Sequence, residues 1–201
     1  FVIIAVLSII IGTFAALDQK KLKTLLAYSS ISHMGYAFLA YTSGSFEGVQ
    51  MLFLYVLIYM LAGLSTWAVV ILINTKDKYI YKTNNDLTEF SSLFKSNSAL
   101  ALILTIILLS LAGFPPLIGF FAKTGIFLVL IESSMYFVAI ISILCSVIST
   151  FYYLRLIKII FFENKLAGNL FYPIKYSKSI ILSLLFFTFI FLFFNPTFIY
   201  L

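Results

Sequence analysis

The middle of one long apolar run reads Leu111-Ala112-Gly113-Phe114-Pro115-Pro116-Leu117-Ile118-Gly119. The run covers residues 99–131, and as one straight helix it would be about 50 Å long at roughly 1.5 Å per residue. The hydrocarbon core of a bilayer is only about 30 Å thick, so one upright helix does not fit. The two prolines remove two backbone donors and hold the preceding residue extended. We therefore predict a helix that is broken at Gly113, Pro115 and Pro116.

The rest of the chain is equally apolar. Of its 201 residues, 63% are hydrophobic and 10% are charged, and the mean hydropathy is +1.13. This composition excludes an ordinary soluble domain. At about 20 apolar residues per crossing, the sequence predicts an all-α, polytopic membrane protein with about six transmembrane helices in one domain, the fourth of them broken. The expected spans are 1–17, 24–42, 49–73, 99–131, 134–162 and 179–200, with a polar loop at 74–98.

The few charged side chains predict the orientation of these spans. Twelve of the thirteen basic residues fall in the turn at 18–23, the loop at 74–98 and the stretch 155–178. Six spans in a zigzag place all three regions on one side of the membrane and the turns near Glu47 and Glu132 on the other. The positive-inside rule assigns the basic side to the cytoplasm or its organellar equivalent. The net charge of +6 is thereby explained by topology, and we expect no nucleic-acid partner.

Lys123 is the basic residue that this topology does not explain. It lies inside the apolar run, where a lysine costs about 2.5 to 3.5 kcal/mol on insertion scales, so it is expected to face the bundle interior or water. A lysine in such a place exchanges its proton more readily than one in water. The alternative is a lysine that snorkels to the nearer interface, but its neighbours, including Phe120 and Phe121, are apolar. We favour a functional role in proton relay.

A second polar patch, residues 28–36, lies inside the span 24–42. Helical spacing places Ser29, His33 and Tyr36 on one face. Histidine titrates near neutrality and relays protons, yet a lone histidine also serves as a simple interhelical hydrogen-bond donor, and serines allow close packing. Both interpretations stay open on the residues alone. The candidates are His33 as a relay and, for a hydrated path, the hydroxyl residues Tyr28, Ser29, Ser32, Tyr36, Tyr55 and Tyr59.

Sequence motifs for bound redox or nucleotide chemistry are absent. The sequence has no phosphate-binding loop and no dinucleotide glycine fingerprint. It has one histidine and one cysteine, Cys145, so neither a disulfide nor a cysteine-based metal site is expected. We predict that this chain binds no cofactor or metal and holds no redox centre, and whether it is an enzyme by itself stays open on the residues alone.

Three segments, taken together, resemble the antiporter-like membrane subunits of respiratory complex I. They are residues 19–36 (QKKLKTLLAYSSISHMGY), 109–123 (LSLAGFPPLIGFFAK) and 151–155 (FYYLR). The subunit 2 relatives are the most similar of the three antiporter-like groups. Subunit 4 relatives carry a glutamate at the position of Lys123, and subunit 5 relatives usually follow that lysine with an acid, where this chain has Thr124.

The resemblance implies a fold of fourteen helices made of two inverted repeats, each with a broken helix. The six predicted spans match helices nine to fourteen, which form the C-terminal half. Lys123 matches the terminal lysine of the family's proton path, and the patch at 28–36 matches part of its hydrated axis, which favours the relay role for His33. The family's first-half glutamate and its two partner lysines have no counterpart here. We expect a separate chain to supply that half, and loss of the N-terminal half from the sequence is the competing explanation.

The implied function is that of a proton-translocating subunit in the membrane arm of mitochondrial NADH:ubiquinone oxidoreductase. The implied location is the mitochondrial inner membrane, with basic loops in the matrix and the C-terminus on the intermembrane-space side. NAD, FMN, iron–sulfur clusters and ubiquinone are expected in other subunits, and the expected partners are other membrane-arm subunits and lipids. The alternatives are a subunit of a cation/proton antiporter, a plastid-type dehydrogenase complex, or a structural subunit that does not pump.

Overall fold

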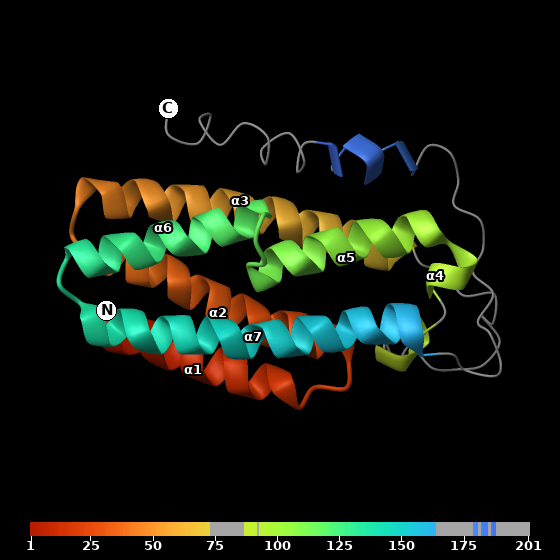
Figure 1. Ribbon diagram of the computed structural model, residues 1–201, viewed down its shortest axis with the longest axis horizontal. Coiled ribbons are helices and arrows are strands. Elements are labelled where there is room, and N and C mark those ends of the chain that lie inside the picture. Colours follow the sequence, from red (N-terminus) through yellow and green to blue (C-terminus); the bar gives the residue numbers. More distant parts are fainter. Residues whose placement is uncertain (73–86, 92, 164–178, 181, 185, 188–201) are drawn as a thin grey trace.

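The computed structural model describes residues 1–72, 87–91, 93–163, 179–180, 182–184 and 186–187. Every regular element within the described residues is helical (Figure 1). In chain order these are α1 (Val2–Leu17), α2 (Leu22–Thr42), α3 (Phe46–Leu72), η1 (Leu87–Phe90), α4 (Leu93–Ser96), α5 (Ser98–Ala112), α6 (Ile118–Glu132) and α7 (Tyr136–Phe162). The prediction of an all-α fold is confirmed.

The helices follow the predicted spans closely. Helices α1, α2, α3 and α7 each overlap one predicted span, and α5 and α6 together overlap the long fourth one. By length and apolar composition α3 and α7 qualify as membrane spans, while α1 and α5 are shorter apolar helices. The predicted polar loop contains η1 and α4. The predicted span at 179–200 lies largely outside the described residues.

The predicted helix break is confirmed between α5 and α6. Helix α5 ends at Gly113, whose φ of 83° is left-handed, and the Gly113 N–H donates to the carbonyl oxygens of Leu109 and Ser110 at 3.1 and 3.0 Å. Glycine is the usual residue after a helix because it adopts this conformation without steric cost. The Pro115–Pro116 peptide that follows is cis, and α6 begins after the extended Leu117. The two half-helices follow one another along the bundle (Figure 1).

The two half-helices overlap at the break and satisfy part of each other's backbone. Ser110, in the last turn of α5, accepts a hydrogen bond through its Oγ from the Gly119 N–H at 3.2 Å. This N–H belongs to the first turn of α6, where backbone donors have no partner within their own helix. A Cβ at Gly119 would overlap the Ser110 carbonyl oxygen. The close approach of the two helix ends therefore requires glycine at this position.

Helices α1 and α2 approach closely through small residues. A Cβ at Gly12 of α1 would meet the Ser32 backbone nitrogen at 2.6 Å, and a Cβ at Gly35 of α2 would lie 3.0 Å from the Ala5 carbonyl oxygen. Small residues at a helix interface let two backbones pack tightly, which is a common source of stability between membrane helices. The hydroxyls of Ser8 and Thr13 donate to carbonyls of α1 itself. This interface therefore depends on packing.

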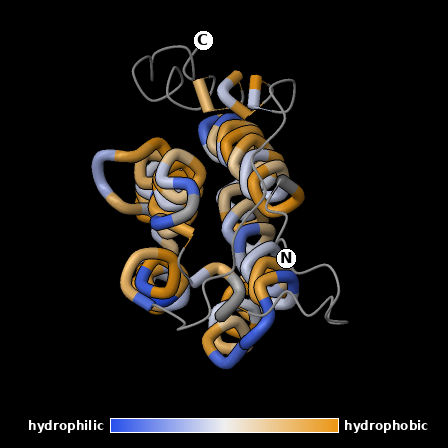
Figure 2. The backbone as a smooth tube through the Cα atoms, turned by 90° about the vertical axis from the view of Figure 1, so that its right-hand side faces the viewer, coloured by the Kyte–Doolittle hydropathy of each residue, from blue (hydrophilic) through white to orange (hydrophobic). Residues whose placement is uncertain are grey.

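The bundle carries large apolar side chains on its outside, and its mainly apolar interior also contains some polar side chains. Hydrophobic residues recur along every helix when the bundle is viewed end-on (Figure 2). The outward faces of α1, α3 and α7 expose large apolar side chains, while the buried set includes hydroxyl groups, one histidine and one lysine. The exposed apolar residues include Ile3, Phe14, Phe53, Leu64, Phe137 and Phe151. Such a surface suits lipid as the surrounding solvent.

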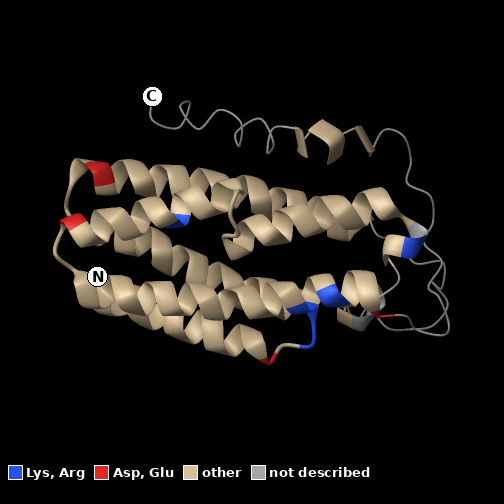
Figure 3. Ribbon diagram, viewed as in Figure 1, with Lys and Arg blue, Asp and Glu red and all other residues tan. Residues whose placement is uncertain are grey.

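The described charges gather at the two ends of the bundle. Lysine and arginine lie mainly at the end that carries α4 and the α1–α2 turn, and acidic residues mark the α2–α3 and α6–α7 turns at the opposite end (Figure 3). One basic residue lies away from both ends, within α6 (Figure 3); α6 contains a single basic residue, Lys123. The spatial arrangement thus matches the charge asymmetry read from the sequence.

Candidate functional site

Lys123 lies inside the bundle, against the helix break. Only 4% of the residue is exposed, and its Nζ donates to the Ala112 carbonyl oxygen at 2.9 Å. Ala112 is the last residue of α5, so this carbonyl belongs to the group that a helix leaves without an internal partner. The C-terminal end of a helix carries partial negative charge and stabilises a cation. The side chain therefore does not snorkel to an interface, and its polar partner is a neutral carbonyl.

Gly113 makes room for the Lys123 side chain. A Cβ at Gly113 would lie 2.9 Å from Lys123 Cδ and 3.3 Å from Nζ. Both distances are tighter than ordinary contacts between carbon or nitrogen atoms, so a larger residue would displace the lysine. Gly113 thus has two functions in the break. Its left-handed φ ends α5, and its missing side chain lets Nζ reach the Ala112 carbonyl.

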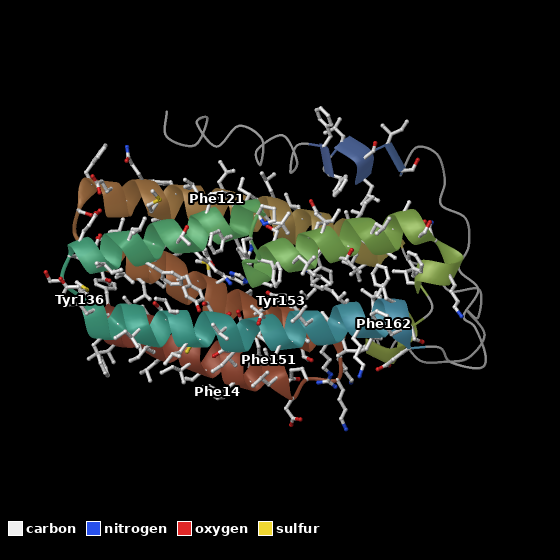
Figure 4. All side chains as sticks on the ribbon, in the orientation of Figure 1. Phe14, Phe121, Tyr136, Phe151, Tyr153 and Phe162 are labelled. Carbon is white, nitrogen blue, oxygen red and sulfur yellow. The ribbon has the colours of Figure 1, made fainter. Side chains whose placement is uncertain are left out.

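His33 on α2 joins three helices through its ring. It is 4% exposed, and its Nδ1 and Nε2 lie 2.7 Å from Tyr55 Oη on α3 and 3.0 Å from Tyr153 Oη on α7. The Tyr59 ring stacks on the imidazole at 4.6 Å between centroids. Tyr153 points into the bundle from α7, while Phe151 and Phe14 point outward (Figure 4). Both ring nitrogens have a hydrogen-bond partner on another helix. His33 therefore makes two interhelical hydrogen bonds, where the packing interpretation requires only one.

Tyr36 links the surroundings of His33 to Lys123. Its hydroxyl donates to the Ser142 carbonyl oxygen on α7 at 3.0 Å. The Lys123 Nζ lies 5.6 Å from the centroid of the Tyr36 ring, within the range where an aromatic face attracts a cation. The Tyr36 and His33 rings are 6.5 Å apart between centroids. An ammonium at Lys123 is therefore stabilised by a helix end and by an aromatic face.

A small cavity separates Lys123 from His33. Its volume is about 20 Å³, and its lining includes both of these residues together with Tyr55, Tyr59, Ser110 and Gly119. That space is sufficient for about one water molecule. A water there would lie between the Lys123 amine and the hydroxyl of Tyr55, which is itself the partner of His33.

A larger cavity extends from this region toward the basic end of the bundle. Its volume is about 170 Å³, room for several waters, and Tyr59 and Leu111 line both cavities. Its polar lining residues are Lys23, Ser29, Ser30, Tyr59 and Thr66. The two cavities together give a row of hydroxyl and amine groups from Lys23 to Lys123.

The structure brings most of the candidate residues predicted from the sequence together around the two cavities and Lys123. Ser29, Tyr55 and Tyr59 line the two cavities, and Tyr36 contacts Lys123. Tyr28 and Ser32 line neither cavity, and their backbone atoms face Gly12 of α1. The sequence interpretation missed the site residues Tyr153, Ser110, Ala112 and Ser142. The regular spacing of Ser142, Cys145, Ser149 and Tyr153 along α7 is a signal that would have found two of them, Ser142 and Tyr153, because these positions share a helix face.

Metal ligands do not converge at this site. Among the described residues, no three His, Cys, Asp or Glu side chains lie close enough together to hold a metal ion. Cys145 is a free, buried thiol. The chemistry available in this part of the chain is therefore hydrogen bonding and proton exchange among lysine, histidine, tyrosine and water.

Comparison with known proteins identifies the family. The family model described as NADH:quinone oxidoreductase/Mrp antiporter, TM, matches residues 1–149. NADH-quinone oxidoreductase subunit N of Pelagibacter ubique is 46% identical over 164 residues, which cover 82% of this chain and 34% of that relative. NADH-ubiquinone oxidoreductase chain 2 of Marchantia polymorpha is 37% identical over 99% of this chain and 40% of its own length.

A solved structure agrees with these relatives. A chain of respiratory complex I from Thermus thermophilus with bound aureothin superposes with a TM-score of 0.83 at 30% identity, over 98% of this chain and 43% of that one. This chain thus spans between a third and a half of the length of the proteins it matches. The fold and the matched sequence agree with these relatives, and the chain belongs to the NADH:quinone oxidoreductase/Mrp antiporter transmembrane family.

Proposed function

We propose that this chain forms part of the proton-translocating membrane arm of an NADH:ubiquinone oxidoreductase, with Lys123 as its proton-exchanging group. One observation carries the proposal: the Lys123 amine is buried at the helix break, its partner is a carbonyl, and a water-sized cavity joins it to His33. A buried amine with no fixed counter-ion accepts and releases a proton in response to small changes of local potential. The relatives named as oxidoreductase subunits support this function.

The proton path follows the hydrogen-bonding groups. A proton reaches His33 through the hydroxyl-lined cavity and crosses to neutral Lys123 through the Tyr55 hydroxyl and one water. The resulting ammonium is stabilised by the Ala112 carbonyl and the Tyr36 ring. A change of charge elsewhere in the arm then expels the proton toward the acidic end of the bundle. Moving one charge against 100 mV costs about 2.3 kcal/mol, which is comparable with the contribution of a single hydrogen bond to a charged group.

The proposal extends to location, partners and cofactors. We place the chain in the mitochondrial inner membrane, with its basic end in the matrix, because it resembles a plant chain 2 along nearly its whole length and because its charge asymmetry has the sign that the positive-inside rule requires. Other membrane-arm subunits and lipids would cover the apolar outer faces. NAD, FMN, iron–sulfur clusters and ubiquinone would be held by other subunits, which makes this chain a translocase component without its own redox centre.

Replacing Lys123 by methionine in the assembled complex tests the proposal. We expect Lys123→Met to assemble and to lower the number of protons pumped per electron, because methionine keeps the length and loses the amine. Lys123→Arg should also impair pumping, because arginine does not release its proton. Lys158→Met, at an exposed lysine of the basic end, is the matched control and should pump normally. An unchanged proton-to-electron ratio in both Lys123 variants would leave the chain a structural, non-pumping subunit.

The cation/proton antiporter alternative has its own test. The matched family model includes Mrp antiporters, so family membership alone does not separate the two functions. Purification of the chain together with flavin and iron–sulfur subunits supports the oxidoreductase. Sodium/proton exchange by a complex that lacks those subunits would support the antiporter.

A further inference from the structure

Ser110 differs from the other buried hydroxyl residues of the long helices. Among the described residues, the others each donate to a carbonyl of their own helix three or four residues earlier; they are Thr13, Ser29, Ser32, Ser65, Thr66, Thr105, Ser142 and Ser149. Ser110, which is 2% exposed, has no such bond within the described chain, and its Oγ instead accepts from the Gly119 N–H at 3.2 Å. A hydroxyl that bonds back to its own helix is satisfied locally. The Ser110 hydroxyl serves the contact between α5 and α6.

This bond is one of two that join α5 to α6 within the described residues. The other runs from Lys123 Nζ to the Ala112 carbonyl oxygen at 2.9 Å. The remaining hydrogen bonds at the break stay within α5 and the connecting segment; their donors are the backbone N–H groups of Gly113, Phe114 and Leu117. Apart from the lysine itself, the Ser110 hydroxyl is therefore the hydrogen-bonding group that fixes the first turn of α6 against the end of α5.

The two bonds lie next to each other across the break. Gly119 and Lys123 are four residues apart on α6, so they share one face at successive turns. A Cβ at Gly119 would lie 3.0 Å from Ser110 Oγ, so this hydroxyl packs directly against that face. Ser110 and Lys123 also line the same cavity of about 20 Å³. Holding Gly119 in place therefore also fixes where the lysine side chain begins relative to the Ala112 carbonyl.

We infer that Ser110 is a positioning residue for Lys123, which keeps the amine at the end of α5. Without the Ser110 oxygen, the Gly119 N–H would be buried without an acceptor, which is unfavourable. The first turn of α6 would then shift, and the ammonium would lose part of its stabilisation by the Ala112 carbonyl and the helix end. This inference rests on the proposed function and deepens it, because it assigns to Ser110 an effect on how tightly Lys123 holds its proton.

No carboxylate near the amine would compensate for such a shift. The titratable side chains around Lys123 and its direct neighbours are His33 and Tyr36 on α2, Tyr55 and Tyr59 on α3, and Cys145, Tyr152 and Tyr153 on α7. Helices α1 and α5 contain no titratable side chain. The acid of α6, Glu132, is nine residues beyond Lys123, about 13 Å along the helix. The Ala112 carbonyl therefore has no acidic substitute among the described residues.

The pH dependence of proton pumping by Ser110→Ala in the assembled complex tests the inference. The rate of NADH-driven pumping is divided by the wild-type rate at each pH, which removes the pH dependence of the other subunits. We expect the alkaline limb to move to lower pH by about 0.5 to 1 unit, the size of one weakened hydrogen bond, because the amine then gives up its proton more readily. Ser110→Thr keeps the oxygen and should keep the wild-type profile.

Ser65→Ala is the matched control. Ser65 is also 2% exposed, but it donates to the Leu61 carbonyl of its own helix at 2.8 Å, so its loss should leave the pH profile unchanged. Ser110→Cys carries the same test if the alanine variant does not assemble, because sulfur is a weak acceptor; its profile should move in the same direction. In a Lys123→Met background, Ser110→Ala should cause no further loss of pumping, since Ser110 acts through the lysine.

The outcomes separate this inference from the proposed function. A profile of Ser110→Ala, or of its cysteine substitute, that stays in place or moves to higher pH overturns the inference and leaves the hydroxyl a purely structural tie. A shift in Ser110→Thr as large as that in Ser110→Ala, or a further loss of pumping in the Lys123→Met background, also overturns it. Normal pumping by Lys123→Met contradicts the proposed function. Defective pumping by Lys123→Met together with a wild-type profile in Ser110→Ala contradicts the positioning role alone.

Discussion

The α1–α2 interface and the interface around Lys123 bury polar groups in opposite ways. Between α1 and α2, the hydroxyls of Thr13 and Ser32 donate to carbonyls of their own helices, and the two helices meet through glycines. Around Lys123, long side chains reach across to other helices, as His33 does to Tyr55 and as Lys123 does to Ala112. Both interfaces lie within the same bundle.

The difference shows which buried polar groups can carry a proton. A hydroxyl that bonds back to its own helix is satisfied locally and serves packing. A side chain that bonds across helices joins a connected network, in which one change of protonation affects the next group. Substitutions at the first interface should therefore alter stability without altering proton transfer, and substitutions at the second should alter both.

The largest effect is expected at Gly113. In Gly113→Ala, the left-handed residue would cost about 1 to 2 kcal/mol, and the new Cβ, 2.9 Å from Lys123 Cδ, would add about 1 to 3 kcal/mol of overpacking. We expect most proton pumping to be lost, measured as protons per electron in reconstituted complex. An asparagine at position 113 adopts the left-handed backbone at little cost, but its side chain still displaces the lysine. Near-normal pumping by Gly113→Asn would therefore show that the space for Lys123 is unimportant.

The packing interface should respond to Gly35→Ala. The added Cβ would overlap Ser8 Oγ and lie 3.0 Å from the Ala5 carbonyl oxygen, so we expect destabilisation of about 1 to 3 kcal/mol. The thermal unfolding temperature of the chain measures this loss. Protons pumped per electron should stay normal in the complexes that assemble. A lower number of protons per electron in Gly35→Ala, at an unchanged unfolding temperature, would place the α1–α2 interface in the proton path. The contrast between this interface and the one around Lys123 would then be lost.

A smaller effect is expected when one bond to His33 is removed. Tyr55→Phe deletes the hydroxyl that lies 2.7 Å from Nδ1, which should cost about 0.5 to 1.5 kcal/mol of stability. The pumping rate should fall as well, because His33 loses one of its two partners. Tyr136→Phe, at an exposed tyrosine on α7, removes a hydroxyl outside the network and serves as the control. Equal pumping by the two variants would contradict a role for the His33 network.

The smallest effect concerns the acidic end, outside the membrane spans. A hydrogen bond that protonated Glu132 donates to the Glu47 carboxylate, together with the negative charge of Glu47, raises the pKa of Glu132 above its ordinary value. A carboxyl whose pKa is raised in the folded chain makes a contribution to stability that falls as pH rises from the unfolded pKa through the folded one. Glu47→Gln removes the neighbouring charge and should lower the pKa of Glu132, measured by infrared titration of carboxyl bands. An unchanged titration in that variant would show that the two side chains do not interact.

Much of the fold could be predicted because each helix has a local cause. The prolines at 115 and 116 lack backbone donors, and Gly113 adopts a left-handed φ, so the break is encoded within a few residues. Lys123 could be predicted as a site residue for a similar reason: no neighbour in its own segment accounts for a charge there. Neither conclusion requires knowledge of which helices are adjacent.

The partners of these residues could not be predicted in the same way. Tyr153 lies 120 positions after His33 in the chain, and nothing in the sequence distinguishes its hydroxyl from that of Tyr152. The hydrogen bond from the Gly119 N–H to the Ser110 hydroxyl depends on the angle at which the two half-helices meet. Tyr28 and Ser32 have the composition of a hydrated path, but backbone atoms of both face Gly12 of α1, and neither residue lines the two cavities.

The sequence by itself determined that this chain is a helical membrane protein, that one helix is broken, and that one lysine lies at membrane depth, because hydrophobicity, proline geometry and charge are properties of single segments. The tertiary structure alone decided that the lysine bonds to the end of α5, that a water-sized cavity separates it from His33, and that Tyr55 and Tyr153 hold the imidazole from two sides. Those contacts join residues from different helices, and only the packing of the bundle determines which side chains face one another.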